Sequence, residues 1–440
     1  MADTSILCER IHYRHDHKWT AVVEMSGNSC LLCTACVVEM LEDQTLSIVR
    51  KKHILSCFGN LTSRFAAVVV DLLMQDERVY AHFLGTLLGM LQMTEDAAML
   101  ERIIQVLLQL IVEVKSEGFI KCILEECEKQ ITNNSNKRSC LPTFTFLGKL
   151  LDLVPALVEP LSLHCGSLIE QLNSALLFPD ENLKTAVCYI YAHLYSSPVA
   201  AEKQSVICQE QLCGLLLSTL DNAQTRELQV NCIGCLKQLL KYSHLVSVMM
   251  NPCIGDDNSD NTQLFQCNNS LPLILKKVLL SRDETLQIAS SQCIASILVH
   301  SPQLYARLVI HANIPEFLFE RLCSTSDVLL WSIYSCLLLL VEESLFFSKC
   351  NAVYGIESLV RSLKEVLRHN NQDAQKQGIL LFTEILKRQP VNIKLFSTTS
   401  VFKDAIQALQ DGINDPSLEV ATEAACTIVA LYRLFPRVSF

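Results

Sequence analysis

Six segments of the chain share one pattern of apolar and polar positions. They begin at Asp180, Thr225, Asp283, Ser326, Asn371 and Asp415. Three apolar columns follow these starts: Leu183, Leu228, Leu286, Leu329, Ala374 and Leu418; then Tyr191, Leu236, Ile294, Leu337, Phe382 and Cys426; then Leu194, Leu239, Ile297, Leu340, Ile385 and Val429. The second and third columns lie 8 and 11 residues after the first, so all three fall on one face of a 3.6-residue helix. The pattern predicts six amphipathic helices, each preceded by a polar residue that can accept from its free N–H groups.

The six predicted helices are regularly spaced. Their first apolar positions are separated by 45, 58, 43, 45 and 44 residues, and the long spacing contains an Asp/Asn-rich stretch. A period near 44 residues is typical of armadillo and HEAT repeats. One such unit cannot bury its apolar face alone, whereas stacked units bury a continuous core. We therefore expect an all-α fold, an armadillo/HEAT-like right-handed α-solenoid of stacked helical repeats.

The repeat pattern divides the chain into consecutive parts. We expect an N-terminal segment at 1–28, divergent helical repeats at 29–131, a polar linker at 132–140, armadillo-like repeats at 141–250, an inserted polar loop at 251–270 and armadillo-like repeats at 271–440. Helices are predicted at Glu77–Gln92, Glu95–Lys115 and Glu117–Ile131. The first contains Gly85 and Gly89, a spacing that favours close packing of two helices.

A cysteine run near the N-terminus raises the question of a metal site. Cys30, Cys33 and Cys36 form a C-x₂-C-x₂-C run within SCLLCTACVVEMLED, residues 29–43. On a helical wheel the three cysteines share one arc with apolar residues, and acidic residues lie opposite, which predicts a buried amphipathic helix. The alternative is a zinc site that recruits His12, His15 or His17, although no Gly or Pro separates the cysteines to form a turn.

A second pair, Cys232 and Cys235, poses the same question inside a predicted repeat helix. Neither a thioredoxin-like βαβ pattern nor partner cysteines surround it, so we interpret both as core residues. We expect no metal and no other cofactor.

Composition and charge exclude several classes of protein. The formal net charge of −10 disfavours a nucleic-acid surface, which needs a basic stripe to bind phosphates. The longest apolar run, at 328–341, has 14 residues, which is too short for a membrane span and is typical of a buried core helix. Twenty-one cysteines without a secretory signal predict reduced thiols in the cytosol or nucleus.

No sequence pattern indicates catalysis. The chain contains no phosphate-binding G-x₄-G-K-[ST] loop, no H-E-x-x-H helix, no G-x-S-x-G elbow and no dinucleotide-binding fingerprint. Asp71, which stands alone in an apolar stretch, is interpreted as a residue at a helix edge rather than a catalytic base. We therefore expect a non-enzymatic protein that binds other proteins and takes no small-molecule substrate.

Peptide-binding armadillo proteins such as importin-α and β-catenin carry a ladder of Asn residues on the long helix of each repeat. The matching column here is His193, Gln238, Ser296, Leu339, Glu384 and Ile428. Because this column contains no Asn, we expect a partner to bind in another mode.

The last helix is followed by apolar residues, among them Phe435 and Phe440, where a capping repeat would be polar. We therefore expect further repeats or a partner to cover this end.

One stretch carries a family resemblance. WSIYSCLLLLVEESLFFSKCNAVYGIESLVRSL, residues 331–363, resembles the meiosis inhibitor protein 1 family, animal armadillo-type proteins that are longer than this chain. The likeness extends over most of the chain, which therefore resembles a shorter form or a part of such a protein.

The resemblance implies a nuclear scaffold that assembles other factors and is required for programmed meiotic double-strand breaks, homologous synapsis and recombination in germ cells. No family motif carries catalytic, cofactor-binding or metal residues onto this sequence. The alternative is a general armadillo/HEAT adaptor in the cytoplasm.

Overall fold

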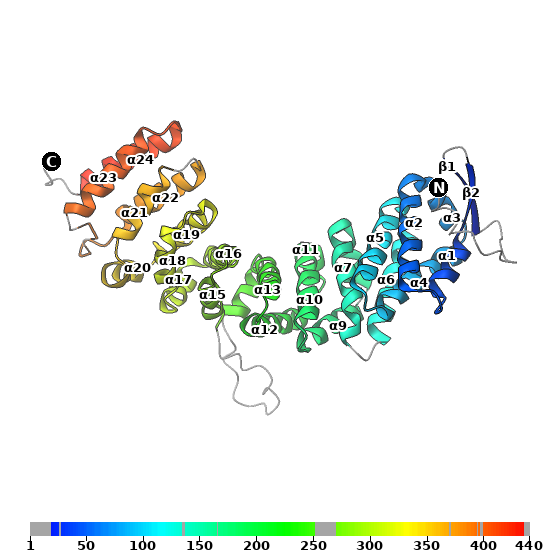
Figure 1. Ribbon diagram of the computed structural model, residues 1–440. Helices are drawn as coiled ribbons and strands as arrows, with labels where there is room; N and C mark the ends of the chain where they lie inside the picture. Colours follow the sequence, from blue (N-terminus) through cyan, green and yellow to red (C-terminus); the bar gives the residue numbers. More distant parts are fainter. Residues whose placement is uncertain are drawn as a thin grey trace, which may run out of the picture. The chain divides into compact units, whose positions relative to one another are not determined.

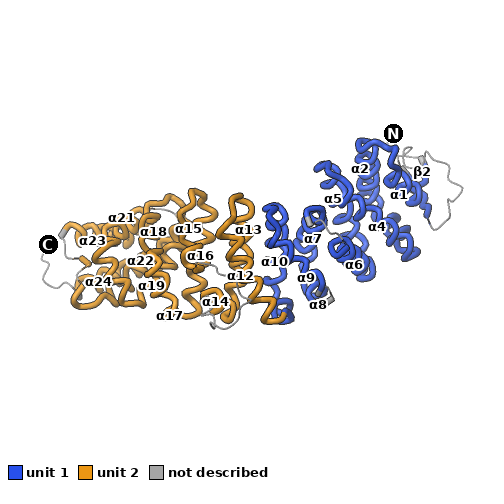
Figure 2. The backbone as a smooth tube through the Cα atoms, turned by 90° about the horizontal axis from the view of Figure 1, so that it is seen from below, with its two compact units in different colours: residues 1–204 blue, residues 205–440 orange. Residues whose placement is uncertain are grey.

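A computed structural model of the chain describes residues 19–25, 28–133, 137–164, 166–250, 270–368, 371–393, 395–396 and 399–434. This part of the chain is helical apart from a two-stranded hairpin, so the all-α prediction is confirmed (Figure 1). The chain forms two compact units, Met1–Gln204 and Ser205–Phe440 (Figure 2).

Unit 1 contains the hairpin and eleven of the described helices. Its elements are β1 (Thr20–Met25), β2 (Asn28–Cys33), α1 (Thr34–Glu42), α2 (Ile48–Arg64), α3 (Ala66–Met74), α4 (Glu77–Met93), α5 (Ala97–Val114), α6 (Glu117–Asn133), the 3₁₀ turn η3 (Lys137–Cys140), α7 (Leu141–Leu153), the 3₁₀ turn η4 (Pro155–Leu157), α8 (Val158–His164), α9 (Gly166–Leu177), α10 (Glu181–Leu194) and α11 (Pro198–Glu202). The three helices predicted in the divergent part are confirmed as α4, α5 and α6.

Unit 2 continues the alternation of long and short helices. Its elements are α12 (Val206–Asn222), α13 (Arg226–Leu239), α14 (Ser243–Met250), α15 (Leu271–Leu279), α16 (Glu284–His300), α17 (Pro302–His311), α18 (Ile314–Glu320), the 3₁₀ turn η5 (Arg321–Cys323), α19 (Asp327–Leu340), α20 (Ser344–Lys349), the π-helical turn η6 (Cys350–Tyr354), α21 (Glu357–Val366), α22 (Gln372–Arg388), α23 (Thr399–Ile413) and α24 (Leu418–Leu434). Five of the six predicted repeat helices lie in this unit, and α10 of unit 1 is the other.

Polar contacts one repeat apart show that unit 1 is also a stack of repeats. Lys52 Nζ lies 3.1 Å from Asp96 Oδ2, 44 residues later, and Thr86 Oγ1 donates to Glu42 Oε1 over 2.8 Å across the same separation. Gln109 Nε2 donates to Ser63 Oγ over 2.6 Å, 46 residues earlier. The period that the sequence shows clearly only after Asp180 therefore also governs which helices of unit 1 meet.

The predicted starts of the repeat helices are confirmed except for the last. Side-chain oxygens of Asp180, Asp283, Ser326 and Asn371 accept from backbone N–H groups two or three residues later, as helix caps do. In all five helices before α24, the three predicted apolar columns are buried.

In α24 the predicted register is wrong by two residues. Leu418 is 81% exposed, Val429 is 50% exposed, and the buried positions are instead Val420, Ala424, Thr427 and Leu431. The cause is a local turn, because Asp415 Oδ1 accepts from the N–H of Ser417 over 2.8 Å and the helix begins only at Leu418. The buried position thus stands three residues after the residue preceding the helix, as in the other repeats.

Several predicted segments lie wholly or partly outside the described residues. These are most of the N-terminal segment, residues 251–269 of the inserted loop and the C-terminal residues 435–440. In the predicted linker, α6 runs to Asn133 and η3 begins at Lys137. The domain boundaries stay predictions, and the chain passes from unit 1 to unit 2 at Gln204, within the predicted repeats 141–250.

Within the described ranges no single helix is long and apolar enough to cross a membrane, while three sharply bent helix pairs reach the required length and composition together.

Candidate interaction surface

The long helices of unit 2, α13, α16, α19, α22 and α24, pack on one another in that order (Figure 1). Their exposed sides form one surface, which we call the long-helix face. To compare positions, each helix is numbered from its first buried column residue, which is Leu228, Leu286, Leu329, Ala374 or Val420. This number is called the offset.

Polar contacts between neighbouring helices fix the register of the long-helix face. Lys237 Nζ, at offset 9 of α13, donates to Gln292 Oε1, at offset 6 of α16, over 2.7 Å. Gln377 Nε2, at offset 3 of α22, donates to Ser335 Oγ, at offset 6 of α19, over 3.3 Å.

Lys376 and Glu419 form an ion pair between offset 2 of α22 and offset −1 of α24. In all three contacts, the residue on the later helix has an offset three lower than that of its partner on the earlier helix. These contacts define how α13 lies against α16, α19 against α22, and α22 against α24.

The column that corresponds to the Asn ladder of armadillo proteins lies at offset 10. With the corrected register of α24, its last member is Ala430 rather than Ile428. Glu384 in this column is held by its own helix, because Arg388 Nε donates to it over 2.8 Å and Lys387 Nζ lies 3.1 Å away. These contacts, that with Arg388 most of all, lower the pKa of the Glu384 carboxyl. The corrected column still contains no Asn.

The group most similar to a catalytic triad is found in unit 1. The Tyr189 hydroxyl donates to Asp152, and His193 Nε2 lies 3.1 Å from Asp152 Oδ1. Burial, followed by the contact with Asp152, raises the pKa of Tyr189 to about 12. The phenol therefore stays protonated at neutral pH and acts as a donor rather than a nucleophile. Because Asp152 belongs to α7 and the other two residues to α10, the group joins two stacked helices.

The structure corrects the prediction that residues 29–43 form one helix. Asn28–Cys33 is strand β2, paired with β1 so that Val22 lies opposite Leu31, and only Thr34–Glu42 is helical. Cys30 therefore lies in a strand, Cys33 ends that strand, and Cys36 lies in the first turn of α1. Cys33 and Cys36 are fully buried, as expected for residues of the hydrophobic core.

The metal alternative is not tested by this geometry. His12, His15 and His17 lie outside the described residues, as does the side chain of Cys30. In the described part of the chain, no three His, Cys, Asp or Glu side chains are grouped so that they could hold a metal ion. The expectation of no metal stays a prediction.

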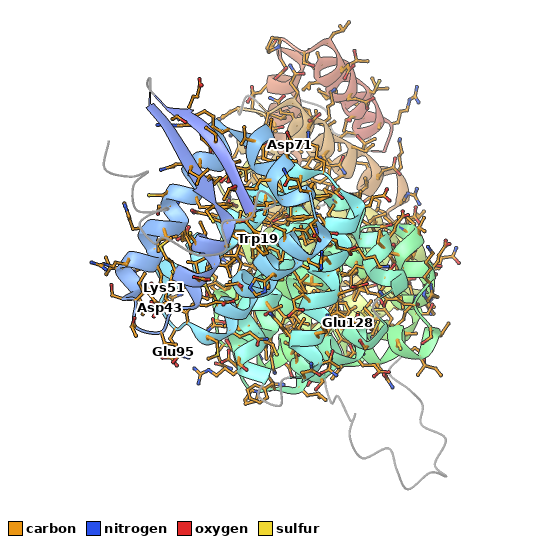
Figure 3. All side chains as sticks on the ribbon, turned by 90° about the vertical axis from the view of Figure 1, so that its right-hand side faces the viewer. Trp19, Asp43, Lys51, Asp71, Glu95 and Glu128 are labelled. Carbon is orange, nitrogen blue, oxygen red and sulfur yellow. The ribbon has the colours of Figure 1, made fainter. Side chains whose placement is uncertain are left out.

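The remaining candidate residues from the sequence lie in described helices. Cys232 and Cys235 are both fully buried on α13. Asp71 is exposed on α3, close to the hairpin end of unit 1 (Figure 3). The prediction that Gly85 and Gly89 allow close packing of two helices is wrong, because a Cβ atom added at either position would meet no atom within 4 Å.

The prediction of a buried core helix at 328–341 is confirmed for the apolar columns, but one side of the helix is exposed. Leu329, Leu337 and Leu340 are buried, whereas Val328 and Trp331 are 54% and 42% exposed. Trp331 stands at offset 2, outside the three apolar columns.

Known proteins resemble this chain in sequence and in structure. A family model described as the meiosis inhibitor protein 1 N-terminal domain matches residues 32–437. Curated proteins named Meiosis inhibitor protein 1 from Homo sapiens and Mus musculus are 50% and 46% identical over 431 residues, which is 98% of this chain. The aligned region is 33% and 34% of their lengths, so the chain spans about a third of these curated relatives.

Solved structures share the fold at low sequence identity. An engineered protein aligns with 90% of this chain and 98% of its own length, at a TM-score of 0.56 and 14% identity. A designed armadillo repeat protein aligns with 60% of this chain and 99% of its own, at a TM-score of 0.42 and 14% identity. At such identity the first likeness concerns the fold alone.

Proposed function

The chain belongs to the meiosis inhibitor protein 1 family, and from this we propose that it is a non-enzymatic scaffold for meiotic recombination. In this proposal it binds protein factors that start programmed double-strand breaks, and so supports synapsis and recombination of homologous chromosomes in germ cells. It acts in the nucleus. The alternative, a general adaptor in the cytoplasm, is an outcome of the test described below.

The observation that carries the scaffold proposal is the long-helix face. Five stacked helices present a continuous surface whose register is fixed by contacts such as Lys237 with Gln292 and Gln377 with Ser335. A stack of this kind offers an extended, preformed binding surface to partners. The meiotic part of the proposal is supported by the family and by nothing in the geometry.

The chemistry of the described residues supports a binding role rather than a catalytic one. The buried thiols of Cys213, Cys293 and Cys336 have pKa values raised to about 12, chiefly by burial, and are therefore not thiolates at neutral pH. The exposed carboxylates of Glu384 and Asp152 are engaged in contacts within or between helices. Direct binding to DNA is not part of the proposal because the net charge is −10.

The proposal is tested by purifying the endogenous, tagged protein from juvenile testis, separately from nuclei and cytosol, and identifying co-purifying proteins by mass spectrometry. We expect enrichment in the nuclear fraction together with chromosome-axis and recombination-initiation proteins. Recovery only with cytoplasmic complexes, or no enrichment in germ cells over somatic cells of the same tissue, would overturn the meiotic function and leave the general adaptor.

A further inference from the structure

Two neighbouring helices of unit 2 have exposed sides without any charged residue. In α16, residues 285–299 contain no Asp, Glu, Lys, Arg or His, and in α19 the same holds for residues 328–341. The helices on either side differ, since α13 carries Lys237 and α22 carries Asp373 and Lys376 on the long-helix face. We call the exposed sides of α16 and α19 the uncharged strip.

Large apolar side chains are exposed on the strip. Because α16 and α19 are packed neighbours, the exposed sides of the two helices adjoin each other. Val299, Val328 and Trp331 are 65%, 54% and 42% exposed. All three stand outside the buried columns, so the strip exposes large apolar side chains on an acidic protein.

The size of the strip fits a single helix better than a second folded chain. About 14 residues at 1.5 Å per residue give a length of roughly 20 Å. Two helices packed 8–10 Å apart give a width of roughly 20 Å. The resulting area, on the order of 400 Å², is about half of what each partner buries in a stable interface between folded proteins. It is sufficient for three or four turns of a helix that lays its apolar side onto the strip.

The charges at the border of the strip indicate which helix would bind. Glu284 and Asp373 are exposed in the first turns of α16 and α22, and Asp327 begins α19. Acidic first turns are ordinary for helices, because they complement the helix dipole. In three successive packed helices, however, they place carboxylates at the same end of the strip. A partner helix with Lys or Arg beside its apolar residues matches that end, and an acidic helix does not.

We propose that the uncharged strip binds an amphipathic helical segment of a partner protein, with apolar residues on Trp331 and Val328 and basic residues toward the acidic first turns. The proposal rests on the scaffold function and not on its meiotic part. An exposed aromatic residue such as Trp331 is a common centre of binding energy in such contacts. Binding here does not require an Asn ladder, since the apolar strip replaces recognition of an extended backbone.

The test uses the full chain and a display library of 18-residue helical peptides with randomised apolar and flanking positions. We expect enrichment of peptides with apolar residues at i, i+3 or i+4 and i+7 and with Lys or Arg on one flank. In a Trp19→Phe background Trp331 is the one remaining tryptophan of the chain. Its fluorescence emission is expected to move to shorter wavelength when such a peptide binds.

Variants of the strip decide the outcome. Trp331→Glu and Val328→Glu should each weaken binding about tenfold or more, the loss typical of a central interface residue. Leu304→Glu, at a position on α17 that is 55% exposed, should leave binding unchanged. Circular dichroism verifies that each variant is folded. If Trp331→Glu does not fold, Val328→Glu alone tests the strip.

The proposal is overturned if no peptide is enriched over the unselected library, if enriched peptides are acidic, or if they bind both strip variants as tightly as the wild type. None of these results bears on co-purification from testis nuclei, so failure of the strip and failure of the meiotic function are distinguishable.

Discussion

Thr383 Oγ1 and Thr427 Oγ1 lie 2.6 Å apart in the buried contact between α22 and α24. The two residues are separated by 44 residues, the period of the repeat. Each hydroxyl also lies within hydrogen-bond distance of a carbonyl oxygen of its own helix, at 2.9 Å for Thr383 and 2.7 Å for Thr427. Because each hydroxyl has a single proton, one donates to its helix and the other donates across the contact. The pair therefore couples two successive repeats through one buried hydrogen bond.

Replacing both threonines tests this coupling. Thr383→Val or Thr427→Val alone should lower the free energy of local opening of α24 by about 1 kcal/mol, because a buried hydrogen bond is lost. The double variant should cost less than the sum of the single variants, with a coupling of about 0.5–1 kcal/mol. Hydrogen exchange of the α24 amides measures the opening free energy locally, which suits a repeat array better than a global unfolding transition. Strict additivity would show that the two hydroxyls do not interact.

Replacing Gly85 or Gly89 on α4 by alanine is expected to stabilise the protein. A Cβ atom at either position meets no atom within 4 Å, and the helix continues through both. Alanine also reduces the conformational freedom of the unfolded chain, so each substitution should stabilise by about 0.5–1 kcal/mol. An upward shift of the Tm of the chain is the measurement.

Gly148 on α7 is the matched control for these two glycines. A Cβ atom there would lie 2.8 Å from Tyr189 Cδ1, which is closer than side chains tolerate. Gly148→Ala should therefore lower the Tm, since Tyr189 must move away from its contact with Asp152. A lower Tm for all three alanine variants would mean that the exposed side of α4 is covered in solution.

Thiol reactivity should separate the cysteines by burial. Among the described cysteines, Cys323 and Cys426 are exposed, while Cys213, Cys293 and Cys336 are buried with pKa values raised to about 12. Alkylation at pH 8, followed by mass spectrometry of each cysteine, should label the first two quickly. The other three should react only after denaturation. Rapid labelling of Cys293 or Cys336 in the folded protein would show that the contact between α16 and α19 opens readily.

The sequence predicts much of this fold because two signals coincide in most repeats. In α16, for example, a capping Asp283 and an apolar period that starts at Leu286 indicate the same helix start. In α24 the capping residue and the buried apolar positions indicate different helix starts. Asp415 is a good cap by residue type, but its side chain accepts from the N–H of Ser417 and so delays the helix by two residues. The choice between a cap and a turn depends on the backbone path, which the pattern of residues does not contain.

The hairpin and the exposed tryptophan were missed for different reasons. Leu31, Leu32 and Cys33 are apolar without a gap, which suits a helix as well as a strand, and only the pairing of β2 with β1 decides. Trp331, in contrast, stands outside the apolar columns, but so do Leu330 and Ile333, which are buried. The columns therefore predict residues of the core, and they do not decide which of the other apolar residues are exposed.

Glu384 should make the stability of unit 2 depend on pH in the acid range. Its pKa is lowered, first by the hydrogen bond from Arg388 and then by Lys387, and Arg388 also approaches Glu342, in the turn after α19, at 3.7 Å. A carboxyl whose folded pKa is lowered contributes stability above its unfolded pKa, about 4.3 for Glu. That contribution is lost as the pH falls through the lower folded value.

The Tm of the wild type should therefore fall more steeply between pH 5 and pH 3 than the Tm of Glu384→Gln, which has no carboxyl to protonate. Glu320→Gln is the control, because Glu320 is exposed and forms no ion pair within the described part of the chain. Its pH profile should follow that of the wild type. If Glu384→Gln also follows the wild type, the contact of Glu384 with Arg388 does not persist in solution.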